Sequence, residues 1–377
     1  MPVPDISLLY KDGANFTTFN APIQSVSISR GRSRQFDRFQ SGSATINFLD
    51  RDRKLDPLNT SSTYYGKILP RMQFQLKAGT TAIYTGVVTD WDNSYDVAGN
   101  NTAVAFCSDA FTVASNTVFT SATSFSEGSC QKRINDALGT FSYSGAKSIG
   151  PGNANLAADV VPAGTQLLDY LFDVASSDFG NLFTSADGTL TFVGRTGREP
   201  ISELTFADDG SGIPYSNLQN QYGDELLFNR VNVESEVGSV TLENSTSINT
   251  FGLSVLNITK LLNAYDADLT ALANYVLKAY KDPAVRFTGL MVELAGLSSA
   301  NVSSVLGLDL ADQVSVKRSF NVGSPSSVTQ NLIVSGIRHT VRPGSHVIEF
   351  SFEPTPYFDA LILDDSADGI LNTDLLG

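Results

Sequence analysis

The sequence has few of the residues from which catalytic and metal sites are built. It contains 2 histidines, 2 cysteines and 1 tryptophan among 377 residues, and only 17% of the chain is charged. Two cysteines exclude a disulfide framework or a zinc cluster, so we interpret Cys107 and Cys130 as buried thiols, with one bridge in an exported particle as the alternative. No apolar run reaches the roughly 18 residues of a membrane span. The N-terminus lacks a charged leader and a cleavage site, which predicts a soluble, unprocessed protein made in a cytoplasm.

Positive charge is scarce as well. The 25 Lys and Arg residues are outnumbered by 39 Asp and Glu residues, which gives a formal net charge of −14. Such a protein does not grip nucleic acid or an anionic membrane, because both repel it. The same charge lets DNA pass along the protein without sticking.

Aromatic residues, by contrast, are plentiful in an uncharged polar background. There are 23 Phe and 13 Tyr residues, which fit pleated strands well. Early in the chain apolar side chains recur at every second position, as at Val26 and Ile28, which is the pattern of half-buried strands. Residues 83–91 and 102–106 flank a Gly-Asn turn and predict a hairpin.

Helical spacing of apolar residues begins only after this region. It occurs over residues 129–138 and 165–175, where Thr165 is a predicted N-cap. A third helix is predicted over residues 267–280, and Pro283 prevents its continuation.

These elements divide the chain into four predicted parts: an N-terminal β-barrel at 1–106, an α+β middle domain at 107–225, a second β-barrel with a helix at 226–353, and an extended arm at 354–377. The two barrels echo each other in sequence. Phe74-x-Leu76, Tyr84-Thr-Gly-Val-Val and Val104-x-Phe106 correspond to Val314-x-Val316, Val334-Ser-Gly-Ile-Arg and Ile348-x-Phe350. The predicted fold class is mainly β (α+β), with two β-barrel domains flanking a small α+β middle domain.

The two histidines are a candidate metal site. A turn at residues 343–344 pairs Val341 with His346 and His339 with Ile348, so both histidines lie on one apolar face. No Cys or Asp shares that face, and we interpret the histidines as satisfied, semi-buried side chains.

Carboxylate pairs are the other candidates for chemistry. Residues 50–56 begin like a calcium loop, but Leu55 occupies the position of the turn glycine, so we expect a local ion-pair network instead. Asp208, Asp209 and the pair at 364–365 are interpreted as solvated turns rather than glycosidase carboxylates. We predict no enzyme and no catalytic, cofactor-binding or metal-binding residues.

One basic cluster stands out in this acidic chain. Opposite charges on neighbouring copies attract, so the cluster predicts intersubunit contacts. A solvated face with local aspartates is the alternative. The cluster consists of Arg30, Arg32, Arg34, Arg38, Arg51, Arg53 and Lys54.

The same region resembles a known family. The stretches that match are 28–46, the Asp50-Arg-Asp-Arg-Lys-Leu-Asp-Pro-Leu-Asn turn, Tyr64-Tyr-Gly-Lys, Leu69-Pro-Arg and the ending from Phe358 to Leu376. They resemble minor tail proteins, or tail hubs, of long-tailed (siphovirus-like) actinobacterial phages, which are related to the baseplate hub of contractile-tailed phages. The resemblance spans most of the chain and is densest over residues 25–92.

This resemblance implies a structural virion protein at the distal end of the tail, assembled in the bacterial host cytoplasm. Hubs of this family form homotrimers in which each copy supplies two tail-tube-like barrels, so six barrels meet a six-fold tube. It implies no cofactor. The implied partners are the distal tail protein, the tape measure protein and other tail-tip proteins or fibres, while phage DNA passes without sequence-specific binding.

Three alternatives remain open at the sequence level. The chain is a distal tail ring adaptor, a receptor- or carbohydrate-binding tail-tip module, or a glycan-degrading enzyme. A hexamer would favour the adaptor, exposed aromatics at loop tips would favour the binding module, and loss of cell-wall release on mutating Asp208 and Asp209 would favour the enzyme.

Overall fold

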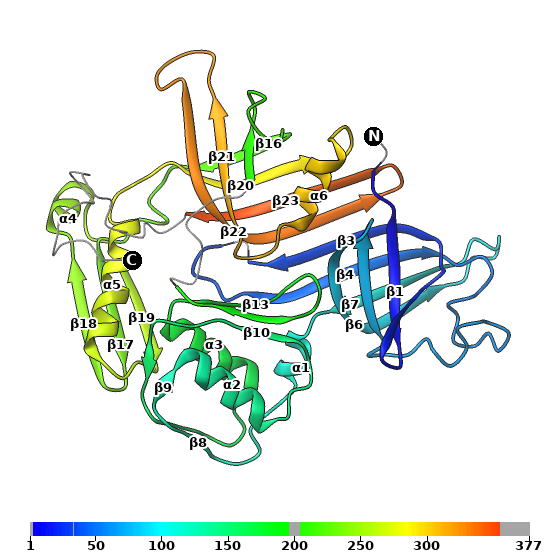
Figure 1. Ribbon diagram of the computed structural model, residues 1–377, viewed down its shortest axis with the longest axis horizontal. Helices are drawn as coiled ribbons and strands as arrows, with labels where there is room; N and C mark the ends of the chain where they lie inside the picture. Colours follow the sequence, from blue (N-terminus) through cyan, green and yellow to red (C-terminus); the bar gives the residue numbers. More distant parts are fainter. Residues whose placement is uncertain (1–2, 33, 196–203, 355–377) are drawn as a thin grey trace.

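The computed structural model describes residues 3–32, 34–195 and 204–354, so the predicted C-terminal arm lies outside the described residues except for Pro354. Strands make up 44% of the chain and helices 17%, which confirms the mainly β prediction. Most strands belong to one 13-stranded sheet, and a helical layer lies beside it (Figure 1).

The N-terminal half of the large sheet contains the first seven strands. They are β1 (Ile6–Asp12), β2 (Asn15–Thr18), β3 (Ile23–Gly31), β4 (Gln40–Leu49), β5 (Gln73–Ala78), β6 (Thr81–Ser94) and β7 (Thr102–Ser108). β6 and β7 form the predicted hairpin. The sheet curls so strongly that β1 crosses β3 and β4 (Figure 1). The aromatic rings of Phe19, Phe48, Tyr64 and Phe74 fill the space inside this curl.

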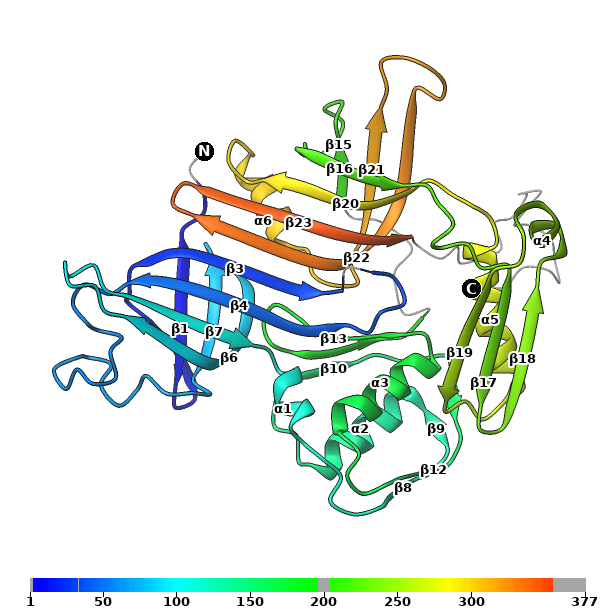
Figure 2. The same ribbon diagram turned by 180° about the vertical axis from the view of Figure 1, so that it is seen from behind.

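The C-terminal half comes from strands much later in the chain. They are β15 (Leu204–Ala207), β16 (Asn217–Gln221), β20 (Arg286–Glu293), β21 (Gln313–Ser319), β22 (Ser327–Arg342) and β23 (Ser345–Pro354), with helix α6 (Ser299–Gly307) between β20 and β21. The β21–β22 hairpin projects from the body in both views (Figures 1 and 2).

The two halves repeat one strand order. The order β3-β4-β7-β6-β5-β1 in the first half matches β16-β20-β23-β22-β21-β15 in the second, and the matched strands also follow one another in the same chain order. One difference is that β1 runs antiparallel to β5, whereas β15 runs parallel to β21. The two halves therefore correspond strand by strand, as the sequence echo suggested.

Hydrogen bonds fix which residues correspond. The N–H of Val88 donates to Met72 and its carbonyl accepts from Arg71, and Val334 makes the same two bonds with Asp312 and Ala311. Each strand then has a bulge at the next residue.

The sequence echo was wrong at this finer level. Tyr84 lies opposite Leu76, whereas the residue opposite Val316 is Gln330. Tyr84 therefore corresponds to Gln330 and not to Val334. Strand alternation repeats every two residues, so an echo of apolar positions tolerates a slip along the strand.

A single strand pairing joins the two halves. β3 pairs antiparallel with the second part of β22, from Gly31 opposite Gly336 to Val26 opposite Val341. The halves therefore share one open sheet, and the described strands form no closed barrel. This corrects the prediction of two barrel domains: the apolar core of each half is completed by curling and by neighbouring elements rather than by closure.

A small α+β layer lies under the large sheet. It comprises α1 (Phe111–Ser115), β8 (Thr123–Phe125), β9 (Gly128–Ser129), α2 (Cys130–Thr140), β10 (Lys147–Ile149), β11 (Asn155–Leu156), β12 (Asp159–Val161), α3 (Leu167–Ser177), β13 (Asn181–Thr184) and β14 (Leu190–Val193). The predicted helices α2 and α3 are present. Thr165 is not the cap of α3, however, because the helix begins at Leu167 after Gln166.

A second small unit is inserted between β16 and β20. It contains β17 (Arg230–Ser235), β18 (Gly238–Glu243), α4 (Ser245–Phe251), β19 (Val255–Leu261) and α5 (Asp266–Tyr280), and it has its own apolar core. The buried face of α5 is the predicted one, with Leu269, Leu272, Ala273, Val276 and Tyr280. In the first half, the corresponding place between β3 and β4 holds only a short loop.

The predicted domain boundaries remain predictions. β15 and β16 fall within the segment 107–225, yet they pair with β21 and β20 in the large sheet. The inserted unit falls within the segment 226–353 and forms a sheet of its own. None of the helices in the described ranges is long and apolar enough to cross a bilayer.

Candidate functional site: the open sheet face and the arginine loop

One face of the large sheet is mostly polar along eight neighbouring strands, from β16 to β6. We call it the open face. Strand register places its residues side by side, because alternate residues of a strand point to the same face. Its members include Asn217, Gln219, Met291, Glu293, Val347, Glu349, Ser351, Arg338, Thr340, Ser27, Ser29, Ser43, Thr45, Asn47, Val104, Phe106, Asp90 and Asp92.

The opposite face of the same strands is apolar and buried. Val26, Ile28, Ile46, Ile337 and Phe350 lie there, all at most 2% exposed. Along the open face short hydroxyl and amide side chains predominate, and the acidic Asp90, Asp92, Glu293 and Glu349 outnumber Arg338 and the neighbouring Arg342. A phosphate backbone meets no cluster of positive charge on such a face.

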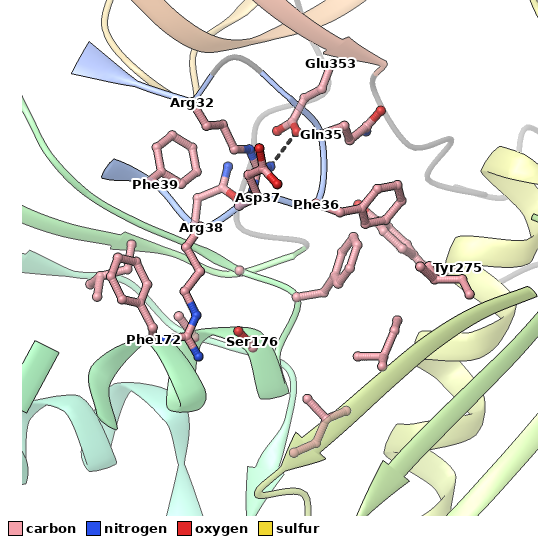
Figure 3. Close-up of a pocket in the computed structure, with 18 of the residues that line it drawn as sticks. Arg32, Gln35, Phe36, Asp37, Arg38, Phe39, Phe172, Ser176, Tyr275 and Glu353 are labelled. Carbon is pink, nitrogen blue, oxygen red and sulfur yellow. Dashed lines mark hydrogen bonds and ion pairs between the residues drawn. The ribbon is translucent and has the colours of Figure 1, made fainter. Parts of the chain in front are cut away.

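The basic residues at the start of the predicted cluster lie in the arginine loop, which we define as residues 30–39, from the end of β3 to the start of β4. Arg30, at the end of β3, is buried and its Nη1 lies 2.6 Å from Asp309 Oδ1. Arg32 Nη2 lies 2.5 Å from Glu353 Oε2, and its guanidinium covers the ring of Phe39 (Figure 3). These two ion pairs tie the first half of the sheet to the second.

The other basic residues of the predicted cluster are more exposed. Arg38 Nη2 lies 2.7 Å from Asp173 on α3. Arg53 and Lys54 pair with Asp56 and Asp52, which is the local network expected for residues 50–56. Arg34 and Arg51 are exposed.

The seven basic residues do not form one patch. The arginine loop precedes β4 and residues 50–56 follow it, so the ten-residue strand separates the two groups. Their role in intersubunit contacts remains a prediction.

A cavity of about 340 Å³ lies beside the arginine loop (Figure 3). Its walls come from the loop, α3, β19 and α5, and the ring of Phe36 packs against Phe179, Phe228 and Tyr280. Gln35 donates a hydrogen bond to the Tyr280 hydroxyl. The loop therefore fastens the inserted unit to the α+β layer, a structural role that accounts for these aromatic residues.

The predicted hairpin register of the two histidines is confirmed. His339 lies opposite Ile348 and Val341 opposite His346. The two imidazoles are buried and bonded to each other, with His339 Nδ1 and His346 Nε2 3.0 Å apart. Among the described residues no group of three His, Cys, Asp or Glu side chains is placed to hold a metal ion.

The candidate carboxylates Asp208 and Asp209 have neighbouring cations, whereas the pair at 364–365 lies outside the described residues. Asp208 lies 2.6 Å from Arg318, and Asp209 lies 2.7 Å from Lys317. Hydrogen bonds from Lys317 and Ser211 hold the pKa of Asp209 well below its usual range. A carboxyl group held ionised in this way is poorly suited to donate a proton as a glycosidase acid.

Both cysteines are free, buried thiols, which settles the alternatives left by the sequence. Burial raises the pKa of Cys107 to about 12 and raises that of Cys130 further. Because the thiolate is the reactive form, we expect no labelling of the native protein by a maleimide at neutral pH, and labelling of both thiols in denaturant. Mass spectrometry of the quenched reaction measures this, and rapid native labelling would contradict the burial of these side chains.

The acidic partners of the arginine loop could not be predicted from the sequence. Asp309, Glu353 and Asp173 are each more than 130 positions away from the arginine that they contact. Isolated acids in an acidic chain have no local pattern that marks them as partners.

Comparison with solved structures identifies the fold. A tail protein from Neisseria meningitidis MC58 matches with a TM-score of 0.60 and 12% identity over 93% of this chain and 98% of that chain. The 43 kDa tail protein of prophage MuSo2 from Shewanella oneidensis matches with a TM-score of 0.60 and 11% identity, again over 93% and 98%. This chain has a phage tail-protein fold.

A more distant match extends the tail-protein fold to a secretion system. The Escherichia coli c3393 protein, a component of the type VI secretion system with structural similarity to the T4 tail proteins gp27 and gp5, matches with a TM-score of 0.51. Identity is 9%, and the match covers 89% of this chain and 74% of that chain. No protein-family model and no curated protein matches the sequence.

Proposed function

We propose that this chain is a structural, non-enzymatic tail hub at the distal end of a phage tail tube. In this proposal three copies form a ring that adapts a six-fold tube to a three-fold tip and lets DNA pass. The main observation behind this proposal is that the two halves of the sheet repeat one strand order. A chain with two equivalent halves can fill two of six positions, so three copies complete a six-fold ring.

The open face supports the passage of DNA. A channel wall must not bind the phosphate backbone, and this face combines hydroxyl and amide side chains with an excess of carboxylates. In the proposed ring the open face lines the channel. The net charge of −14 reduces adhesion of DNA elsewhere on the protein.

The fold neighbours support a tail component. Two of them are tail proteins matched along nearly their whole length, and a third is similar to the tail proteins gp27 and gp5. By analogy, the partners of this chain are other tail proteins: the distal tail protein, the tape measure protein and fibres. The link to long-tailed actinobacterial phages rests on the sequence resemblance alone.

The mass of the purified protein tests this proposal. We expect light scattering to give three times the chain mass of 40.4 kDa over a range of concentrations, and negative-stain images to contain rings. A hexamer would favour the ring adaptor instead. A monomer at every concentration would contradict the hub proposal.

The single tryptophan does not support the sugar-binding alternative. Trp91 packs against Phe48 and Phe74 rather than standing at a loop tip, so the single tryptophan is not displayed as a sugar-stacking platform.

A further inference from the structure

We propose that neighbouring copies join through two free sheet edges, β16 of one copy and residues 89–94 of β6 in the next. The proposed register is the one that joins β3 to β22 within the chain. This inference rests on the proposed function, because it names the surfaces through which the ring closes.

The join inside the chain defines the geometry. β22 pairs with β21 over its first part, and beyond the bulge at Ser335 the same strand pairs with β3. In the first half, β6 likewise pairs with β5 up to Val87, but among the described strands residues 89–94 pair with β7 alone. The segment that in β22 is covered by β3 is therefore uncovered in β6.

The second free edge is β16. It corresponds to β3, since Asn217 and Gln219 lie opposite Met291 and Gly289 just as Ser25 and Ser27 lie opposite Asn47 and Thr45. β16 is an end strand of the large sheet, and four of its five residues are exposed. Within the part of the chain that the structure describes, one strand edge of the β3 type and one of the β22 type thus lack a partner strand.

Transferring the internal register gives a specific pairing. Ser27 lies opposite Thr340 in the chain, so Gln219 of one copy lies opposite Ser94 of the next. Val26 lies opposite Val341, and their counterparts Leu218 and Tyr95 are also apolar.

The residues at the internal join are buried, whereas Tyr95, the counterpart of Val341, is exposed. Val26 is 1% exposed and Val341 is 7% exposed, whereas Tyr95 is 57% exposed. Pairing of the two free edges would cover Tyr95 with Leu218.

Charge favours pairing between unlike edges over pairing of an edge with itself. β6 offers Asp90 and Asp92, whereas residues 217–221 of β16 are Asn, Leu, Gln, Asn and Gln. Amide groups donate hydrogen bonds to carboxylates, whereas two β6 edges would bring carboxylates together. Pairing of unlike edges is heterologous, so it builds a ring when the rotation closes.

The β6 segment also has enclosed polar atoms that lack a partner within the described residues. Trp91 Nε1 and Asn93 Oδ1 on β6 are enclosed and have no hydrogen-bond partner within the described chain. Uncovered strand edges of soluble proteins invite pairing with another chain.

Disulfide trapping tests the register. The variant Gln219→Cys/Ser94→Cys places one thiol on each edge, and the native thiols are buried. Opposed residues of antiparallel strands have Cβ atoms about 4.5–5.5 Å apart, close enough for a disulfide after slight adjustment. The matched control is Gln219→Cys/Asn93→Cys, because Asn93 points to the other face of the sheet.

We expect oxidation to give covalent dimers and trimers of the first variant, at least tenfold more than of the control, and no larger species. Under reducing conditions both variants should keep the wild-type mass. A trimer by light scattering that yields no Gln219–Ser94 cross-link would overturn the edge pairing and leave the hub proposal standing. A ladder beyond three copies would overturn ring closure through these edges, and a monomer would overturn the hub proposal itself.

Discussion

The substitution Gly31→Ala should lower the free energy of unfolding by about 2 to 6 kcal/mol. Gly31 has φ +94°, and a Cβ there would lie 2.3 Å from the carbonyl oxygen of Ser335 and 2.8 Å from Gly336 Cα. Both the backbone strain and the clash fall on the strand pair that joins the halves of the sheet. Chemical denaturation followed by tryptophan fluorescence and circular dichroism measures the loss.

Gly99→Ala is the matched control for this substitution. Gly99 has φ +85°, but a Cβ there meets nothing within 4 Å. This variant should therefore show only the cost of the backbone conformation, about 1 to 3 kcal/mol. If Gly31→Ala were no less stable than Gly99→Ala, the close approach of β3 and β22 would be refuted.

Lowering the pH from 7 to 5 should destabilise the protein by about 2 kcal/mol through His346 alone. Burial lowers the pKa of His346 from 6.5 to about 4. Burial, then the neighbouring His346 and Arg30, lowers the pKa of His339 well below its usual value. Below pH 6.5 the unfolded chain takes up protons that the native histidine pair does not bind. Protonation therefore favours the unfolded state, and the free energy of unfolding falls as the pH drops from 6.5 towards 4.

The double variant His339→Leu/His346→Leu isolates this effect. Burial raises the pKa of Asp109 and Asp178, and groups of that kind act in the opposite direction, but they are the same in both proteins. Denaturation at pH 7 and pH 5 should therefore give a smaller loss in the variant than in the wild type. Equal losses would mean that the histidine pair titrates normally and is not a source of acid sensitivity.

Local patterns were predictable from the sequence wherever a few neighbouring residues decide the outcome. The turn at residues 343–344 sets the register of the hairpin, and both histidines lie where that turn requires. Helical spacing identified the buried face of α5, including Leu272 and Val276, because that face repeats along a single element. The start of α3 was missed, since a Thr before a helix does not by itself make a cap.

Long-range pairing was not predictable in the same way. Arg30 pairs with Asp309 at a sequence separation of 279 residues, and β3 pairs with β22 over a similar distance. The prediction of closed barrels failed for the same reason. Alternation indicates that a strand has one buried face, but it does not indicate which edge will meet which partner.

The sequence alone determined the mainly β composition, the net negative charge and the histidine hairpin, and its internal echo indicated two related halves without aligning their residues correctly. These properties depend on residue type and on spacing along a few positions, where short-range sterics and burial act. Only the tertiary structure decided how the halves join, which acids the arginine loop contacts, and which strand edges lack a partner among the described residues. Those outcomes depend on backbone hydrogen bonds between distant strands, and every strand offers the same backbone groups whatever its side chains.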